Sequence, residues 1–207
     1  MLKAILNQFS ENCYILHDHA RAFIIDPGSN YGTMKSYLKD KGLTLDSVLL
    51  THGHYDHISG LNDLLDAFSA PIYIHENERD FLFDPNLNLS SSMKDAFKVK
   101  SKHRIKTFDE NTHLLLDNKP IKVIETPGHT RGSVSFYYDG MLFSGDCLFK
   151  QGIGRTDLPT GDQKTIERTI MGLYKMFDDN TVVYPGHGTF TTIAHEKVYN
   201  PFIRSAK

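Results

Sequence analysis

The sequence predicts an α/β fold in which stacked β-sheets are covered by helices. Three observations support this fold class: short apolar runs typical of buried strands, apolar stripes at helical spacing, and two-residue turn signals typical of antiparallel hairpins. Because hairpins alternate with strand and helix segments, we expect stacked sheets rather than one doubly wound sheet. At 207 residues, the chain is expected to form a single domain over residues 1–207.

Two hairpins are predicted from their turn residues. An early hairpin is expected over residues 14–25, where two apolar runs flank a polar turn at 18–21. A second is expected over residues 133–144, around Asp139 and Gly140. This pair favours a type I′ turn because both central positions need positive φ. Each hairpin should therefore pair its strands antiparallel.

Helices are predicted where apolar residues recur at three- and four-residue steps. The clearest stripes run over residues 58–68 and 166–177, and a weaker one runs over 34–38. Apolar runs at 45–50 and 72–74 indicate buried strands on either side of the first of these helices. We therefore expect this helix to pack on a sheet that contains both strands.

Residues 76–110 form a polar segment without a clean hydrophobic period, and they contain Asp84-Pro85-Asn86 and a run of serines. We expect a partly helical excursion from the main fold. Two interpretations stay open: the segment forms a wall or lid over a site, or it is a solvated surface insertion.

Composition excludes several classes of function. Lysine and arginine total 23 against 25 acidic residues, so the basic excess of a nucleic-acid-binding protein is missing. No stretch approaches the roughly 20 apolar residues needed to cross a bilayer, and no secretory leader is apparent. Cys13 and Cys147 are too few for a disulfide framework and are expected to be reduced core residues. We expect a cytoplasmic protein that binds neither nucleic acid nor membrane.

Four apolar runs each lead into side chains that can bind metal ions. Strand ends suit such side chains because the sheet fixes their position while the loop aims them. Glycines beside several of them let the backbone approach an ion closely. The histidines outside this set lie in turns, polar segments or helical surroundings and are expected to have other roles. The candidate ligands are His52, His54, Asp56, His57, His129, Asp146 and His187.

This donor set suits two ions rather than one. Seven ligands are too many for one tetrahedral zinc, but they fit two ions about 3.5 to 4 Å apart that share a carboxylate and a water-derived ligand. Imidazole and carboxylate donors accept zinc, manganese or iron, so the ligand types do not name the metal. Two divalent cations, two aspartates and one hydroxide leave about one positive charge, which could hold an oxyanion.

The motif His52-x-His54-x-Asp56-His57, followed by His129, Asp146 and His187, resembles the metallo-β-lactamase superfamily. Residues 25–28, Ile-Asp-Pro-Gly, and 154–157, Gly-Arg-Thr-Asp, are similar to segments of its compact glyoxalase II-like branch, which is related to hydroxyacylglutathione hydrolases. The resemblance implies a four-layer αββα sandwich. It also implies the ligand sets: His52, His54 and His129 for one ion; Asp56, His57 and His187 for the other; Asp146 as the bridge.

The resemblance further implies roles for side chains around the ions. Zinc is the expected metal, with iron or manganese as alternatives, and Asp56 is a possible proton acceptor besides being a ligand. Asp26 either caps its turn or steadies the ligands. Arg155 either pairs with Asp157 or contacts a carboxylate of the substrate. The true β-lactamases usually have cysteine in place of Asp146 and lack a histidine at the position of His57.

The expected activity is hydrolysis of a 2-hydroxyacyl thioester of a small thiol by attack of a metal-bridging hydroxide. The substrate is then a small-molecule thioester. The chain ends soon after His187, so the C-terminal helical domain of long glyoxalase II enzymes is expected to be missing, which leaves the thiol open. Four alternatives stay open: a persulfide dioxygenase with one iron bound by His52, His129 and Asp146, a lactonase, a phosphodiesterase, and a non-catalytic metal-binding module.

Overall fold

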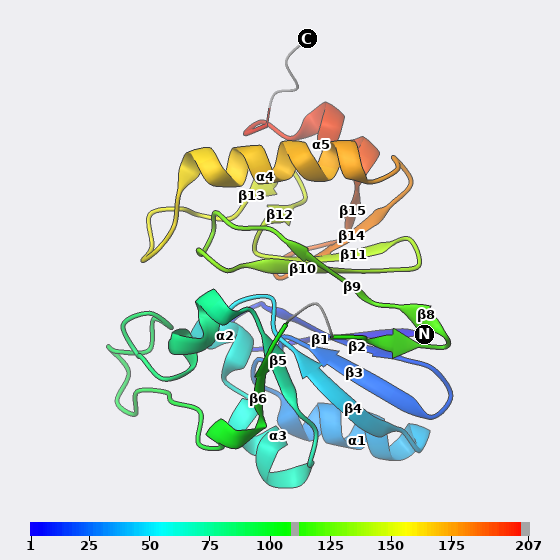
Figure 1. Ribbon diagram of the computed structural model, residues 1–207, viewed down its shortest axis with the longest axis vertical. Coiled ribbons are helices and arrows are strands. Elements are labelled where there is room, and N and C mark those ends of the chain that lie inside the picture. Colours follow the sequence, from blue (N-terminus) through cyan, green and yellow to red (C-terminus); the bar gives the residue numbers. More distant parts are fainter. Residues whose placement is uncertain (109–111, 204–207) are drawn as a thin grey trace. The chain divides into compact units, whose positions relative to one another are not determined.

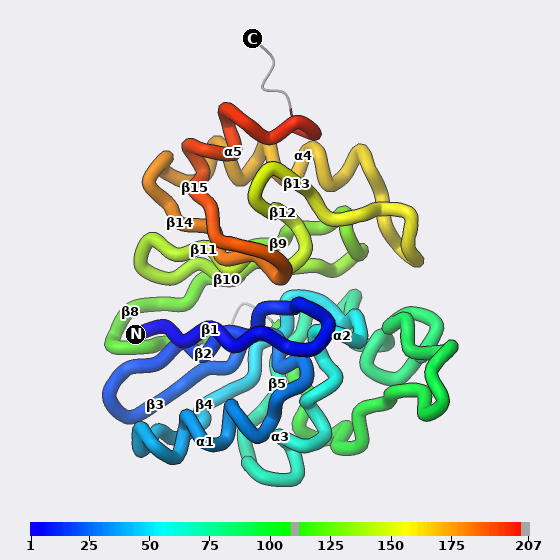
Figure 2. Tube along the Cα trace, turned by 180° about the vertical axis from the view of Figure 1, so that it is seen from behind, coloured from blue at the N-terminus to red at the C-terminus, as the bar shows by residue number. Residues whose placement is uncertain are grey.

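The computed structural model describes residues 1–108 and 112–203. The chain packs as two compact units, Met1–Asn118 and Lys119–Lys207. It passes from the first unit to the second in the turn between β7 (Leu115–Leu116) and β8 (Lys119–Pro120). Each unit holds a sheet and the helices that cover it (Figure 1), and Figure 2 follows the same trace from behind. The single domain expected over residues 1–207 stays a prediction.

The first unit is built on a six-stranded sheet with strand order β1-β2-β3-β4-β5-β6. The first three strands are antiparallel, whereas β3, β4, β5 and β6 run parallel to one another. The carboxyl ends of these four strands therefore meet at one edge of the sheet. The strands are β1 (Leu2–Leu6), β2 (Asn12–His17), β3 (Arg21–Ile25), β4 (Thr44–Leu49), β5 (Ile72–Ile74) and β6 (Ile105–Thr107).

Helices α1 (Tyr31–Lys41) and α3 (Leu61–Ala67) bury their apolar stripes in the core of this unit. Leu38 of α1 and Leu64 of α3 join strand residues such as Val48 in one buried cluster. Burial of a leucine side chain contributes about 1.5–3 kcal/mol, so these stripes hold the helices on the sheet. The early hairpin is confirmed as β2 and β3.

The helix predicted over residues 58–68 is confirmed over Leu61–Ala67, but its expected start is wrong, because Ile58 belongs to a separate short helix. Helix α2 (Tyr55–Ile58) begins inside the ligand motif, and α3 starts after Gly60. The Gly60 N–H donates to the carbonyl of Pro27 at 3.0 Å instead of continuing a helix. A Cβ on Gly60 would lie 2.0 Å from the carbonyl oxygen of Gly28, so this close approach requires glycine.

The excursion predicted over residues 76–110 is only partly correct. It contains two 3₁₀ helices, η1 (Glu76–Leu82) and η2 (Lys102–Arg104), joined by turns. Its end is strand β6, which pairs parallel with β5 and was not predicted. Residues 109 and 110 of the segment lie outside the described residues.

The second unit has a five-stranded sheet with strand order β15-β14-β11-β10-β9. Its one parallel pair is β11 with β14, and the predicted hairpin is confirmed as β10 and β11, with φ of 48° at Asp139 and 84° at Gly140. A separate short hairpin consists of β12 (Leu148–Phe149) and β13 (Gly152–Ile153). The strands of the sheet are β9 (Lys122–Glu125), β10 (Val134–Tyr138), β11 (Met141–Gly145), β14 (Val182–Pro185) and β15 (Thr191–Thr192).

Helices α4 (Gln163–Met176) and α5 (Ile193–Tyr199) complete this unit. The predicted stripe of α4 packs with Leu142 and Val183 of the sheet in a buried cluster. Helix α5 was not predicted because its seven residues give too short a hydrophobic period. Among the described residues, no helix is both long and apolar enough to cross a membrane.

Candidate metal centre

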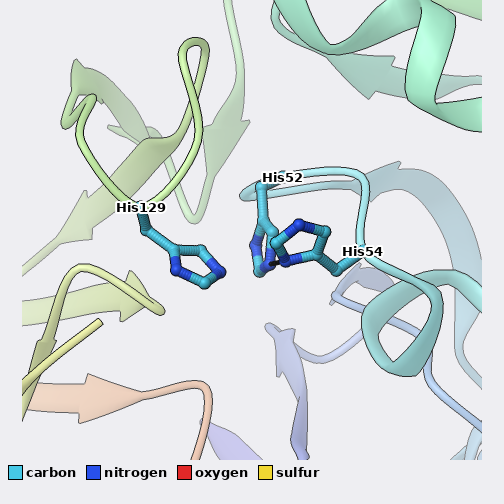
Figure 3. Close-up of side chains that lie close together, drawn as sticks. All are labelled: His52, His54 and His129. Carbon is cyan, nitrogen blue, oxygen red and sulfur yellow. Dashed lines mark hydrogen bonds between the residues drawn. The ribbon is translucent and has the colours of Figure 1, made fainter. Parts of the chain in front are cut away.

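Four candidate ligands follow β4 in the first unit. His52 and His54 lie on the loop after the strand, and Asp56 and His57 lie on α2. His52 Nε2 is 3.1 Å from His54 Nδ1, and Figure 3 shows this contact as a dashed line. The three histidines are at most 2% exposed, whereas the Asp56 side chain is 29% exposed. The turn of α2 separates Asp56 and His57 from the two loop histidines, which a continuing strand could not do.

The loop between His52 and His54 is held by the 3₁₀ helix η1. The Gly53 N–H donates to Glu78 Oε2 at 3.0 Å, and the Glu78 side chain is fully buried. A Cβ on Gly53 would lie 2.3 Å from Cβ of Phe81, so only glycine fits against η1. Glu78 was not predicted, because an acidic residue in a polar segment has the pattern of a solvated surface.

Asp26 fixes both ends of the ligand motif. Its carboxylate accepts hydrogen bonds from the Thr51 N–H at 2.7 Å and the Thr51 hydroxyl at 2.6 Å. The other end is His57, whose Nδ1 lies 3.0 Å from Asp26 Oδ2. With the proton on Nδ1, the lone pair of His57 is on Nε2, the nitrogen available to a metal ion. These contacts support the expectation that Asp26 steadies the ligands.

A second buried contact reaches the motif from the N-terminal loop. Asn7 Nδ2 donates to the Asp56 carbonyl at 3.0 Å and to Glu11 Oε2 at 2.9 Å. Glu11 is fully buried. One carboxylate oxygen of Glu11, one of Asp26 and one ring nitrogen of His57 lie within 4.8 Å of one another. Neither Asn7 nor Glu11 was singled out from the sequence, because nothing local links them to residues 49 positions away.

Three candidate ligands follow separate strands of the second unit: His129 after β9, Asp146 after β11 and His187 after β14. Asp146 Oδ2 lies 3.6 Å from Nε2 of His129 and 3.6 Å from Nε2 of His187. His129, labelled in Figure 3, donates from Nδ1 to the backbone carbonyl of Arg155 at 2.8 Å when that nitrogen carries the proton. One carboxylate oxygen thus lies near both imidazoles.

The β12–β13 hairpin brings the chain back against two of these ligands. A Cβ on Gly154 would lie 1.9 Å from the carbonyl oxygen of Asp146 and 3.1 Å from Cβ of His129. Glycine at this position therefore allows the carbonyl of the next residue, Arg155, to reach His129. Cys147 is 1% exposed, as expected for a core residue, and burial raises the pKa of its thiol to about 12.

Arg155 and Asp157 form the ion pair that was one of the two expectations for this segment. Arg155 Nε and Nη2 each donate to an oxygen of Asp157 at 2.7 Å. Hydrogen bonds from Arg155 lower the pKa of Asp157 to about 2. The side chains are 63% and 68% exposed, so a substrate can reach the guanidinium. Contact with a substrate carboxylate stays a prediction.

The donor atoms within each unit fit a divalent metal ion. Two ligands bound to one tetrahedral ion at about 2.1 Å lie about 3.4 Å apart. In the first unit the corresponding distances are 3.1 Å for His52 with His54 and 3.8 Å for Asp56 with His57. In the second unit both histidines are 3.6 Å from Asp146. Imidazole nitrogens and carboxylate oxygens at these distances suit zinc, iron or manganese.

Residues 6–187 match the family model of the metallo-β-lactamase superfamily, whose members bind divalent metals. The chain therefore belongs to this superfamily and is a metallo-hydrolase. It is 37% identical to the probable metallo-hydrolase YqgX of Bacillus subtilis, over 93% of this chain and 92% of that protein. It is 34% identical to the hydroxyacylglutathione hydrolase GloC of Haemophilus influenzae, over 95% and 94% of the two chains.

Solved structures agree with this assignment. BLEG-1, described as a B3 metallo-β-lactamase, is 38% identical, with a TM-score of 0.90 over 99% of this chain and 100% of that one. TTHA1623, in a di-iron-bound form, is 29% identical, with a TM-score of 0.84 over 97% and 100%. The predicted fold class, the mixed α/β metallo-β-lactamase fold, is confirmed.

Proposed function

We propose that this protein is a binuclear metal-dependent hydrolase that cleaves 2-hydroxyacyl thioesters. The observation that carries the proposal is the set of seven histidine and aspartate donors on segments that follow strands, with spacings that fit metal ions in each unit. Similarity to GloC along nearly the whole chain supports the thioester as substrate class. In this proposal, His52, His54 and His129 hold one ion, Asp56, His57 and His187 hold the other, and Asp146 is shared.

Bound ions would supply a water that is deprotonated at neutral pH and a Lewis acid for the carbonyl oxygen. The protein's own groups prepare and complete the reaction. Asp26 and the Arg155 carbonyl can each accept a hydrogen bond from Nδ1, so that Nε2 of His57 and of His129 would be the nitrogen that binds an ion. The partly exposed carboxylate of Asp56 can accept a proton at the site. A departing thiolate needs no general acid, because thiols have pKa values near 8.5.

Zinc is the proposed metal, and relatives define the alternatives. The di-iron form of TTHA1623 supports iron as an alternative occupant. Similarity to BLEG-1 favours a second candidate function, β-lactam hydrolysis, although a cysteine does not stand at position 146. Persulfide oxidation by a single iron, lactone hydrolysis and phosphodiester hydrolysis stay predictions. We further propose that the enzyme acts in the cytoplasm on a small-molecule thioester, without nucleic-acid or membrane partners.

The deciding experiment measures metal content and activity on the same sample, purified without added metal. About two zinc ions per chain and thiol release from S-lactoylglutathione would support the proposal. Cleavage of nitrocefin without thioester cleavage would favour the second candidate. One iron per chain with oxygen uptake on glutathione persulfide, and no thioester cleavage, would overturn the hydrolase assignment.

A matched pair of variants tests the ligand assignment. His54→Ala should lose metal and thioester cleavage together while the protein stays folded, because the ligand loop lies outside the apolar core. His103→Ala, on the exposed face of η2, should keep both. Full turnover by the His54→Ala protein would contradict the role of this histidine.

A further inference from the structure

A pocket of about 620 Å³ in the first unit is lined by residues of β5, β6 and η1, together with Thr112 and His113. Its size falls within the range of small-molecule sites, roughly 300 to 1,000 Å³. Tyr73 of β5 and Lys106 of β6 are neighbours in the parallel register and form its floor. Glu76 and Arg79 of η1 line one wall. None of these residues belongs to the candidate metal centre.

The pocket lies at the same edge of the sheet as the ligand motif. Strands β4, β5 and β6 run parallel, so their carboxyl ends share one edge, and the motif follows β4. Neighbouring strands are about 4.8 Å apart, which puts the end of β6 about 10 Å from the end of β4. Two strand spacings, about 10 Å, thus separate β6 from β4, the strand that leads into the segment with His52 and His54.

Helix η1 connects the pocket with the metal-ligand loop. Its buried face contacts that loop, since Glu78 accepts from the Gly53 N–H and the Phe81 ring centroid lies 6.0 Å from that of His54. Its exposed face presents Glu76 and Arg79 to the pocket. The same short helix therefore contacts the ligand loop on one side and lines the pocket on the other.

The pocket has the chemistry of a carboxylate site. In the part of the chain that the structure describes, Arg79 has no ion-pair partner, and its planar fork matches a carboxylate through two parallel hydrogen bonds. The Lys106 ammonium lies over the Tyr73 ring, 5.6 Å from its centre. Glu76 is the one acidic lining residue among those described, and it can accept from an amine or amide of the same ligand.

We infer that this pocket binds a carboxylate of the thiol half of the substrate, through Arg79 and Lys106. The inference rests on the proposed thioester hydrolase function. A thiol of tripeptide size spans about 10 Å when extended, which is comparable with the two strand spacings between β4 and β6. Peptide-like thiols also carry the amine and amide groups that Glu76 can bind. The pocket would then select thioesters of a peptide-like, carboxylate-bearing thiol over those of an uncharged thiol.

The test compares two thioesters on the metal-loaded enzyme. S-lactoylglutathione carries carboxylates on its thiol half, whereas S-lactoyl-N-acetylcysteamine carries none. The test variant is Arg79→Ala with Lys106→Ala. A matched control, Lys94→Ala with Lys98→Ala, removes the same charge from exposed positions outside the pocket.

For the test variant we expect KM for S-lactoylglutathione to rise about tenfold or more with kcat nearly unchanged, because the lost contact is made equally in ground and transition states. Its kcat/KM for S-lactoyl-N-acetylcysteamine should equal that of the wild type, and the control should resemble the wild type on both substrates. Competitive inhibition by S-methylglutathione should weaken by the same factor in the test variant only.

Two outcomes would overturn the inference while leaving the proposed function intact. One is unchanged kinetics of the test variant on S-lactoylglutathione. The other is an equal loss on both thioesters, which would indicate a structural role for the two cations. Failure of the wild type to cleave either thioester would instead overturn the proposed function, so the two failures are distinguishable.

Discussion

His57 and His129 are both candidate ligands, but their rings are oriented by different kinds of group. The Nδ1 atom of His57 faces a side-chain carboxylate, Asp26, at 3.0 Å, whereas Nδ1 of His129 faces a backbone carbonyl, that of Arg155, at 2.8 Å. A substitution can remove the first partner directly. The Arg155 carbonyl belongs to the backbone, so a substitution can remove it only by shifting the backbone at that position. The orientation of the ligand is therefore expected to be sensitive to different substitutions in the two units.

The same contrast extends to the rest of each ligand group. In the first unit, four ligands lie within a short segment, and buried side chains from distant positions hold it: Asn7, Asp26 and Glu78. In the second unit, each ligand follows a different strand, and close backbone packing at Gly154 brings the loops together. We expect side-chain substitutions to act mainly on the first group, whereas steric substitutions should act on both, at Gly53 in the first unit and at Gly154 in the second.

The largest effect is expected for Gly154→Ala. The new Cβ would lie 1.9 Å from the Asp146 carbonyl oxygen, which is backbone and cannot turn aside, so the β12–β13 hairpin must move. We expect a loss of about 3 kcal/mol in free energy of unfolding, together with loss of bound metal. Urea unfolding and metal analysis measure the two effects.

Gly152→Ala is the control for this substitution, because its nearest neighbour would be the Phe149 side chain at an ordinary contact distance of 3.5 Å. It should change stability far less and leave metal content intact. Equal stability and metal content in the two variants would show that the hairpin does not need to approach Asp146.

Next in size is Asp26→Asn, which acts on the first unit alone. The amide oxygen of the new asparagine can still accept the hydrogen bond from the Thr51 N–H. If the amide nitrogen faces His57, however, it offers a donor at the position where Nδ1–H of His57 needs an acceptor. The ring then favours the proton on Nε2, the nitrogen proposed to bind metal. We expect metal affinity to fall about 10- to 100-fold while the fold is retained.

Competition with a chelator, followed by circular dichroism on the same sample, measures this effect. Asp40→Asn, at an exposed position of α1, should keep wild-type affinity. If Asp26→Asn binds both ions as tightly as the wild type, the carboxylate does not set the tautomer of His57.

A smaller effect is expected for Glu78→Gln. The amide oxygen can still accept from the Gly53 N–H, but a charge-assisted hydrogen bond becomes a neutral one. We expect a loss of about 1 kcal/mol in free energy of unfolding, whereas Glu78→Ala, which leaves the buried N–H without an acceptor, should cost about 2 kcal/mol or more. A larger loss for Glu78→Gln than for Glu78→Ala in a denaturant titration would contradict the role of Glu78 as the acceptor for the Gly53 N–H.

Local chemistry made much of this molecule predictable. The strands that precede the candidate ligands are apolar runs, and the Asp139-Gly140 turn follows from the φ values that these two residues tolerate. The features that were missed depend on distant parts of the chain. Strand β6 has three residues and takes its pairing from β5, and the helix break at Gly60 exists because the Pro27 carbonyl approaches it.

The buried polar residues around the ligand motif were missed for the same reason. Glu78 contacts Gly53, which lies 25 positions earlier, and Asn7 contacts the carbonyl of Asp56, 49 positions later. A sequence pattern shows which residues can bind metal. It does not show which polar residues are buried behind them, because their burial is decided by packing between segments that have no local relation.

The smallest effect is expected at the Arg155–Asp157 pair, where the partners are exposed and the backbone carbonyl, rather than the side chain, serves His129. Because the folded-state pKa of Asp157 is lowered to about 2, the pair stabilises the fold above the usual carboxyl pKa near 3.9 and loses this contribution as pH falls toward 2. Arg155→Ala should return the pKa of Asp157 toward 3.9, measured by carboxyl NMR titration, without changing metal content. Loss of metal in this variant would show that the ion pair, and not the sheet and Gly154, places the carbonyl against His129.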